Sequence, residues 1–303
     1  MVFRCSFSKS RKALPRNRLY KNLIMKILDT HHHLWDLSLR SYNWIKELPL
    51  NESKIIDKNF IYQDLVNEIE KNDVYSTICV QAHQSEDEAK WLLNIANNSQ
   101  IIKGVVGWID LKSPKIEYKL DEFQKNEKFV GVRHVWHDEK DESWIINPEV
   151  TRGLKALAIR NINFDFLVRP NHLKYIHHVY DEIPDLNGVI DHIAKPEIKE
   201  GNFEPWATEI YELSKINNLS CKISGIIEEM NNDQPLVAAE KYTSYIINSF
   251  GKKRIMYGSN WPVCLTKNSY EYVLNLAKNI SSKFSNLEKE DFFFNNGSRF
   301  YKV

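Results

Sequence analysis

The sequence predicts an α/β fold, and specifically a (β/α)8 TIM barrel. Short apolar runs alternate strictly with amphipathic helical segments, which indicates a parallel sheet with helical crossovers. Eight such units between Met25 and Val303 fit a closed barrel better than an open sheet. No fixed-period repeat and no low-complexity linker divides this region, so we expect one domain over residues 25–303.

Eight strand-like segments support this prediction, because each is a short apolar run between polar or turn residues. In chain order they are Lys26–Thr30, Val74–Ala82, Lys103–Asp110, Val130–Trp136, Asn163–Val168, Gly188–Ile193, Ser220–Gly225 and Arg254–Asn260. The carboxyl ends of these strands matter most for function, since the active sites of such barrels lie at that end.

Amphipathic helix patterns separate the strands. They cover Phe60–Lys71, Glu86–Asn97, Lys115–Gln124, Pro148–Arg160, Leu173–Asp181, Pro205–Ile216, Leu236–Phe250 and Tyr270–Lys278. The first connection, from His31 to Asn59, is long and contains Trp35, Tyr42 and Trp44. Loops of this length in compact domains are usually lids or binding loops, so we expect it to border the pocket.

The net charge of +1 is unevenly distributed along the chain. Residues 1–24 contain seven Lys and Arg and no acidic residue, which leaves 34 basic and 40 acidic side chains in the rest. The barrel is therefore mildly acidic, and it is not expected to bind nucleic acid. For residues 1–24 we expect a disordered tail or translation that begins at Met25, with an organelle transit peptide as the alternative.

Composition also limits where the protein works. No stretch approaches the ~18 consecutive apolar residues of a membrane span. The four cysteines are far apart and form no CxxC motif, which excludes a disulfide framework and a cysteine metal site. We therefore expect a cytoplasmic protein. Glycine-rich phosphate loops and a GxSxG motif are absent from the sequence, so a serine nucleophile has no support.

The segment Asp29-Thr30-His31-His32-His33 ends the first predicted strand. Alternate side chains of a strand share a face, so we expect Asp29, His31 and His33 to face the barrel axis and His32 to point away. Two imidazoles at this spacing can chelate one divalent ion such as zinc, iron or nickel, or hold a substrate carbonyl. The alternative is that each histidine only packs and forms hydrogen bonds.

Arg133 and His134 end the fourth predicted strand, and His192 with Lys195 follows the sixth. His134 and His192 are candidates for metal binding or proton transfer. The planar guanidinium of Arg133 suits a carboxylate, and Lys195 can hold an anionic group. For each of these residues the alternative is a structural ion pair or a solvated side chain.

Lys222 lies within the seventh predicted strand, and Asn260 and Trp261 end the eighth. A lysine in a buried strand is costly unless it is paired, so Lys222 is either a site residue or a partner of a barrel carboxylate. An amide such as that of Asn260 forms hydrogen bonds but cannot accept a proton as a base. Trp261 is expected to form an apolar wall or to pack at the rim.

Together these motifs resemble the amidohydrolase-related (amidohydrolase 2) family of barrels, in the branch with L-fuconolactonase, L-rhamnonolactonase and 2-pyrone-4,6-dicarboxylate lactonase. The resemblance runs from DTHHHLWD at 29–36 to NNGSRFY at 295–301, with GVRHVW, DHIAKP, CKISG and GSNWPV between them. It implies a metal-dependent-hydrolase barrel that opens a lactone. It also implies that His31, His33 and His192 polarise the carbonyl or bind a metal.

The same resemblance implies further site residues. Those expected to bind substrate are Arg133, His134, Lys195, Lys222, Trp35, Trp44 and Trp261. The sequence departs from the family at Asn260, where members usually carry an aspartate that acts as general base. Either Asp29, His134 or His31 then takes the proton, or the activity is altered or lost. One divalent ion, zinc first, is the expected cofactor, with metal-free catalysis as the alternative.

We therefore expect a hydrolase of carbohydrate metabolism, acting on a small sugar lactone or a related cyclic ester. The expected partner is a small-molecule substrate, with no nucleic acid and no membrane; the oligomeric state is left open. Two alternatives remain at this point. One is a zinc decarboxylase of the related branch, and the other is a non-catalytic or weakly active barrel that binds a sugar acid, because Asn260 replaces the base.

Overall fold

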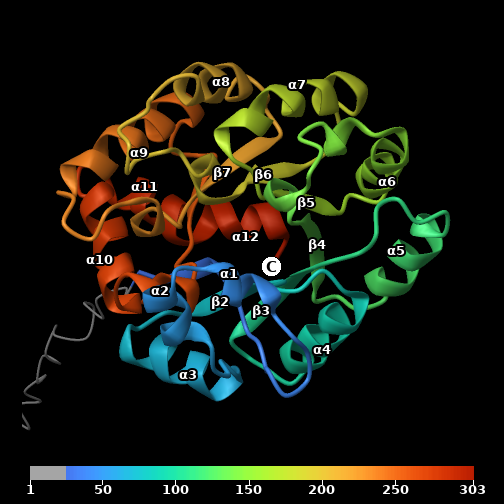
Figure 1. Ribbon diagram of the computed structural model, residues 1–303, viewed down its shortest axis with the longest axis horizontal. Coiled ribbons are helices and arrows are strands. Elements are labelled where there is room, and N and C mark those ends of the chain that lie inside the picture. The colour runs from blue at the N-terminus through green and yellow to red at the C-terminus, as the bar shows by residue number, and fades with distance from the viewer. Residues whose placement is uncertain (1–24) are drawn as a thin grey trace, which may run out of the picture.

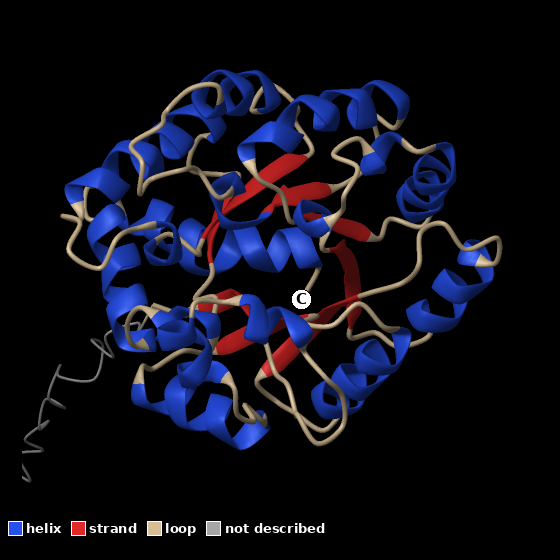
Figure 2. Ribbon diagram, viewed as in Figure 1, coloured by secondary structure: helices blue, strands red, loops and turns tan. Residues whose placement is uncertain are grey.

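Eight parallel strands form one sheet, and they are hydrogen-bonded in sequence order from first to last. The computed structural model describes residues 25–303, so the expectations for the basic segment 1–24 lie outside the described residues. The strands are β1 (Leu28–His32), β2 (Ser76–Val80), β3 (Ile102–Gly107), β4 (Phe129–His134), β5 (Asn163–Phe166), β6 (Gly188–Ile190), β7 (Leu219–Ile223) and β8 (Ile255–Tyr257). Figure 2 shows them inside a ring of helices.

The sheet closes between β1 and the residues that follow β8. The amide of Asn260 donates to the carbonyl of His31 at 2.8 Å, and the amide of His33 donates to the carbonyl of Trp261 at 2.7 Å. His32 and Trp261 form a parallel bridge at the same place. These contacts confirm the predicted (β/α)8 barrel, and they join the histidine segment at the end of β1 directly to the GSNWPV segment after β8.

The outer helices match the eight predicted helix patterns to within a few residues (Figure 1). They are α3 (Tyr62–Lys71), α4 (Glu86–Asn97), α5 (Ile116–Gln124), α6 (Pro148–Ile159), α7 (Leu173–Glu182), α8 (Trp206–Leu213), α9 (Val237–Phe250) and α10 (Tyr270–Ile280). Three of them, α4, α6 and α10, begin with an N-cap side chain that accepts a backbone hydrogen bond, as capping rules favour. For example, the Ser85 hydroxyl accepts a hydrogen bond from the amide of Glu88 at the start of α4.

Four further helices were not predicted. Two of them, α1 (Asn43–Glu47) and α2 (Leu50–Ile56), lie in the long connection after β1. This connection is held down where Trp35 and Phe60 form an antiparallel bridge and where the indole N–H of Trp44 donates to the carbonyl of Ala82 at 3.0 Å. The other two, α11 (Asn286–Glu290) and α12 (Asn296–Tyr301), follow the last outer helix and flank a π-helical segment.

Helix α12 lies across the amino-terminal end of the barrel, where Figure 1 shows it crossing the ring of strands. The side-chain amide of Asn296 donates to the carbonyl of Ile255, the first residue of β8, at 2.8 Å. The side-chain amide of Asn163, at the start of β5, donates to the carbonyl of Phe300 at 3.1 Å. The side chains of α12 complete an apolar cluster inside the barrel, formed by Leu28, Ile78, Val80, Val106, Val189, Met256, Phe300 and Tyr301.

Strands β2 to β8 each end two or three residues earlier than the sequence predicts, and the backbone gives the reason for β6 and β8. β6 stops at Ile190, because the four residues from His192 to Lys195 all have left-handed φ angles between 46° and 62°. β8 stops at Tyr257, and Asn260 has a φ of 57°. Left-handed backbone cannot continue a strand, and it is uncommon outside glycine. Such conformations cluster at functional sites, and here they redirect side chains at the carboxyl end of the barrel.

Within residues 25–303, no helix is both long and apolar enough to cross a membrane.

Candidate active site

His31 and His33 lie side by side at the end of β1. Their Nε2 atoms are 3.2 Å apart, and Nδ1 of His33 lies 2.8 Å from the carbonyl oxygen of Val80. A carbonyl only accepts hydrogen bonds, so Nδ1 carries the proton of neutral His33. The lone pair of His33 is therefore on Nε2 and faces His31. As expected, His32 points elsewhere, and its Nε2 lies 3.0 Å from the Thr77 hydroxyl.

Asp29 does not join these histidines, which corrects the expectation from strict strand alternation. The β1–β2 register shifts between Asp29 and His32, so the side chains of β1 do not simply alternate. The Asp29 carboxylate accepts hydrogen bonds from the amide of Ser259 at 2.8 Å, the Ser259 hydroxyl at 2.6 Å and the Tyr270 hydroxyl at 2.9 Å. Tyr270 belongs to α10, so Asp29 faces the outer helices and is not placed to act as the base.

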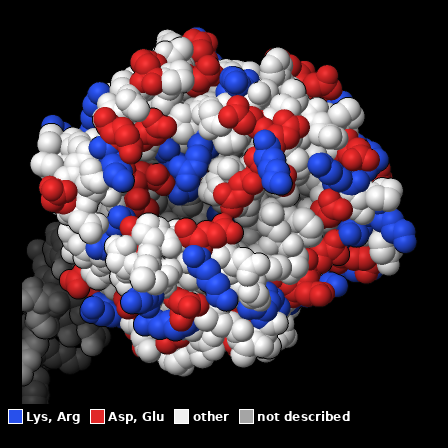
Figure 3. Space-filling model, viewed as in Figure 1, with Lys and Arg blue, Asp and Glu red and all other residues white. Residues whose placement is uncertain are grey.

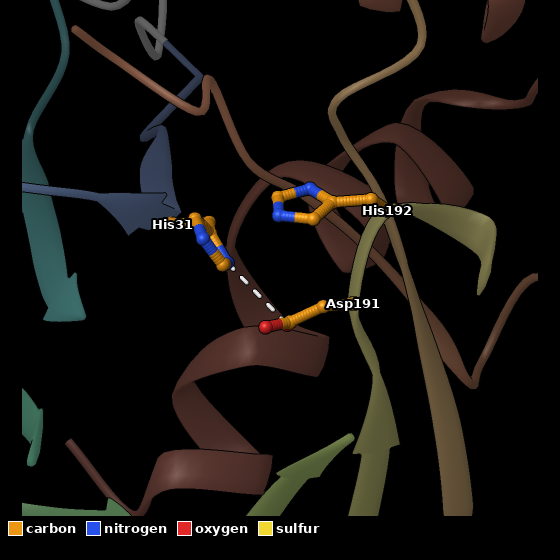
Figure 4. A group of neighbouring side chains, drawn as sticks. All are labelled: His31, Asp191 and His192. Atoms are coloured by element: carbon orange, nitrogen blue, oxygen red, sulfur yellow. Dashed lines mark ion pairs between the residues drawn. The ribbon is translucent and has the colours of Figure 1, made fainter. Parts of the chain in front are cut away.

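His192 reaches the same place from the loop after β6. Its ring centroid is 4.4 Å from that of His31, and Figure 4 shows His31, Asp191 and His192 pointing toward one another. Nδ1 of His192 lies 2.9 Å from the Ser224 hydroxyl. Gly225 passes directly beside this ring: a Cβ at that position would lie 2.6 Å from Nδ1 of His192, and its φ is 59°. Both conditions require glycine there.

Four charged side chains support the histidines from inside the barrel. The Lys222 ammonium lies 2.6 Å from Oδ2 of Asp165 and 3.0 Å from Oδ1 of Asp191. The Arg133 guanidinium lies 3.3 Å from Oδ2 of Asp191. All four residues are at most 4% exposed. Two cations and two anions balance, which makes it possible to bury them.

This network also touches His31 on both nitrogens. Lys222 Nζ is 3.2 Å from Nδ1 of His31 and Arg133 Nη1 is 3.3 Å from Nε2. Asp191 Oδ1 lies 3.3 Å from Nδ1. Burial, and then the charge of Lys222, lower the pKa of His31 well below its ordinary value. Burial likewise lowers the pKa of His33 to about 3 and that of His192 well below its ordinary value. All three rings are therefore neutral at pH 7.

The pKa values of the two aspartates in this network are shifted in opposite directions. Burial raises the pKa of Asp165 to about 6, although Lys222 opposes this. Burial would also raise the pKa of Asp191, but Lys222, His192 and Arg133 together hold it below its ordinary value. The carboxylate beside the histidines therefore stays ionised, because most of the positive charge surrounds it.

His134 and Lys195 lie at the barrel mouth with protein partners of their own. His134 stacks on Trp144 with ring centroids 3.8 Å apart. Its Nδ1 accepts from the indole N–H of Trp108 at 3.1 Å, so its Nε2 carries the proton and donates to Glu139 at 2.7 Å. Lys195 pairs with Glu229 at 2.6 Å. A substrate contact by either residue stays a prediction.

The aromatic residues predicted to bind substrate divide into two groups. Trp35 and Trp261 are at most 1% exposed, and both pack edge-on against Phe60. Contact of Trp35, Trp261 or Lys222 with substrate stays a prediction. Trp44 is only partly buried, so its predicted place beside the substrate stays open.

Sequence reasoning missed Asp165 and Asp191 as site residues. Asp165 interrupts the apolar segment NFDF of β5, and a carboxylate in mid-strand was the available signal, as the ammonium of Lys222 was in β7. Asp191 directly precedes His192 in the DHIAKP motif. Glu228, from the loop after β7, was also missed; it accepts a hydrogen bond from the Asn260 amide at 2.7 Å. No sequence motif marked it.

The residues of the site fit a metal ion such as zinc. Potential ligand atoms of His31, Asp191 and His192 all lie within 4.8 Å of one another, and imidazole with carboxylate is an ordinary zinc donor set. Two nitrogen ligands on tetrahedral zinc lie roughly 3.3 Å apart, given Zn–N bonds of ~2.0–2.1 Å, and the His31 and His33 nitrogens match this. Asp191 Oδ1 is buried without a well-oriented hydrogen bond. The nearby cations of Arg133 and Lys222 oppose binding.

Acidic and basic side chains are interspersed over the face shown in Figure 3, and the surface is hollowed near the centre of this view.

Comparisons with known proteins identify the family. Residues 28–303 match the amidohydrolase family. An L-fucono-1,5-lactonase from Burkholderia ambifaria is 32% identical over 236 residues, which cover 78% of this chain and 80% of the relative. An L-fucono-1,5-lactonase from Burkholderia multivorans is 27% identical over 298 residues, or 91% of this chain and 96% of the relative. A Burkholderia multivorans amidohydrolase solved with bound zinc has a TM-score of 0.85 at 27% identity, covering 92% of this chain and 99% of that one. This chain therefore belongs to the amidohydrolase family.

Proposed function

We propose that this protein hydrolyses a small sugar lactone or a related cyclic ester. The observation that carries the proposal is the meeting of three neutral histidines, His31, His33 and His192, over a charge-balanced pair of aspartates and cations. Lactone hydrolysis places negative charge on the carbonyl oxygen, and fixed polar groups in a buried site stabilise such charge effectively. The similarity to two L-fucono-1,5-lactonases supports this choice of substrate class.

Each group has a role in this scheme. The imidazoles bind the carbonyl oxygen and hold it against the charge network, while Asp191 and Lys222 fix the orientation of His31. A zinc ion held by His31, His192 and Asp191, with His33 beside them, would supply Lewis-acid polarisation of the same carbonyl. Mixed acidic and basic groups at the mouth, such as Lys195 and Glu229, suit the hydroxyl groups of a sugar ring.

A lactone screen tests the proposal directly. Purified protein, with and without added zinc or manganese, is incubated with five- and six-membered sugar lactones, and acid release is followed with a pH indicator. We expect hydrolysis of at least one sugar lactone well above the spontaneous rate. The proposal is wrong if folded protein hydrolyses none of them under any metal condition.

A second candidate function is sugar-acid binding without catalysis. The observation that favours it is Asn260, whose amide cannot accept a proton from water. In that case calorimetry shows binding of a sugar acid while the lactone screen shows no turnover. The two candidates are therefore separated by the same pair of measurements.

Metal binding is tested apart from activity. We expect zinc added to metal-depleted protein to raise its Tm, because a ligand that binds only the folded state stabilises it by RT ln(1 + [L]/Kd). His192→Asn removes one nitrogen ligand and should abolish this shift. Magnesium, which prefers oxygen ligands in octahedral geometry, serves as the control and should leave the Tm unchanged. An equal zinc shift in wild type and variant would place the metal elsewhere.

A further inference from the structure

Glu228 and Asn260 meet at the barrel mouth from two neighbouring loops. Glu228 lies in the short 3-10 turn Ile227–Glu229, which comes after β7, and Asn260 follows β8. The Asn260 side-chain amide donates to Oε1 of Glu228 at 2.7 Å, while its backbone amide donates to the carbonyl of His31 at 2.8 Å. Asn260 thus connects the Glu228 carboxyl group to β1, the strand that carries His31.

The hydrogen-bond partner of Glu228 is of a different kind from the partners of the other carboxyl groups at or near the site. Each of the others is engaged by a cation, a histidine or several hydrogen bonds: Asp165 and Asp191 by Lys222, Glu139 by His134, Glu229 by Lys195, and Asp29 by Ser259 and Tyr270. The described partner of Glu228 is a neutral amide. A carboxylate paired with a cation is a poor proton acceptor, since the pair stabilises its ionised form.

We propose that Glu228 is the general base of the hydrolysis and that Asn260 positions it. This inference rests on the proposed lactone hydrolysis. Asn260 holds one carboxylate oxygen, Oε1, and leaves the second oxygen to accept a proton from water. The left-handed φ of 57° at Asn260 turns its side chain toward Glu228 while its backbone stays bound to β1.

The protonation of Glu228 suits this role. Burial raises its pKa to about 7, which the Asn260 hydrogen bond and the charge of Lys195 oppose and the charge of Glu229 reinforces. Burial also raises the pKa of the Cys264 thiol, so this thiol stays uncharged. A base is most effective when its pKa is near the working pH, and Glu228 meets this condition.

The step balances without a further reactant. Glu228 takes a proton from water as the water oxygen bonds to the lactone carbonyl carbon, and the carbonyl π electrons move to the carbonyl oxygen. The C–O bond to the ring oxygen then breaks as the carbonyl re-forms. The departing oxygen takes the proton back from Glu228, which yields the hydroxy acid and restores the carboxylate.

Glu228→Gln is the test, because it keeps the size of the side chain and its contact with Asn260 but cannot accept the proton. We expect kcat to fall about 10²–10⁴-fold and KM to change little. Glu228→Asp should retain part of the rate, and it controls for folding together with the far-ultraviolet spectrum. Glu212→Gln, on the exposed face of α8, is the matched control and should leave the rate unchanged.

The pH profile separates the base from a structural residue. For the wild type, log kcat/KM should fall with unit slope below about pH 7, since only ionised Glu228 accepts a proton. Glu228→Gln should lack this limb. Asn260→Asp places a second carboxyl group at 2.7 Å, so two acids share one proton, and the limb should move to higher pH with a lower rate at pH 7.

The outcomes distinguish this inference from the proposed function. If wild type hydrolyses a lactone but Glu228→Gln keeps more than a third of its kcat, the assignment of the base is wrong and the hydrolysis stands. A large gain in rate for Asn260→Asp also overturns it, because the native site would then lack a working base. If wild type hydrolyses no lactone, both proposals fall together.

Discussion

Lys222→Met is expected to destabilise the folded protein by about 3–5 kcal/mol, because it leaves two buried carboxylates without their shared ammonium. Lys222 is completely buried and lies within 3.0 Å of both Asp165 and Asp191. Methionine has a similar length and packs well, so the loss reflects charge rather than volume. Urea unfolding at pH 7, followed by circular dichroism, measures the difference in free energy of unfolding.

The pH dependence of this loss identifies its cause. Without Lys222 the pKa of Asp165, already about 6, rises further above its value in the unfolded chain. A carboxyl group whose pKa is raised on folding contributes stability at low pH that is lost as the pH rises. The destabilisation should therefore be larger at pH 8 than at pH 5. Adding Asp165→Asn to Lys222→Met should restore part of the lost stability.

A matched lysine shows what a solvated ion pair contributes. Lys215 pairs with Glu212 at 2.7 Å on the surface, with both side chains about half exposed. Lys215→Met should change stability by less than about 1 kcal/mol. If Lys222→Met costs no more than Lys215→Met, the buried network does not have the importance described above.

His192→Asn is expected to reduce kcat/KM for lactone hydrolysis about 10³-fold, or about 4 kcal/mol at 1.36 kcal/mol per tenfold change. The reason is that His192 meets His31 at 4.4 Å between ring centroids, where the carbonyl oxygen is proposed to bind. Removal of one group that stabilises an oxyanion typically costs 10²–10³-fold, and removal of an acid or base 10²–10⁴-fold. Steady-state kinetics on the best lactone measures the effect.

Two further variants serve as an intermediate case and a control for His192→Asn. Ser224→Ala removes only the partner of Nδ1 in His192, and we expect a loss of about tenfold, since the ring is less well oriented. His177→Asn changes a partly exposed histidine on α7 that pairs with Glu209 at 3.3 Å, and it should have no effect. A rate for His192→Asn within threefold of wild type would exclude it from the chemistry.

The barrel was predictable because each of its parts follows a local pattern. Each strand and each outer helix has its own apolar periodicity, so the alternation is visible without knowledge of any long-range contact. α12 shows the limit of this approach. Its sequence NGSRFY has no helical stripe, and its burial depends on residues such as Leu28 and Ile255 that are far away in the chain.

For the site, residue types could be predicted more reliably than directions. The structure brings His31, His33 and His192 together, and the sequence placed all three at strand ends. Asp29 was misassigned because a register shift in β1 cannot be seen in a pattern of alternation. Lys222 could be recognised as costly, but only the fold shows that it pairs with Asp165 and Asp191.

Helix α12 has a consequence for how the protein is made. The Tyr301 hydroxyl donates to Oδ2 of Asp165 at 2.8 Å, so one of the last residues in the sequence supports a carboxylate in β5. Translation proceeds at about 5–20 residues per second, so a growing chain has Asp165 in place several seconds before Tyr301 is added. During that interval Phe300 and Tyr301 are missing from the apolar cluster inside the barrel, so this cluster cannot form in full. We therefore expect the barrel to reach its full stability only after α12 has been synthesised and has docked.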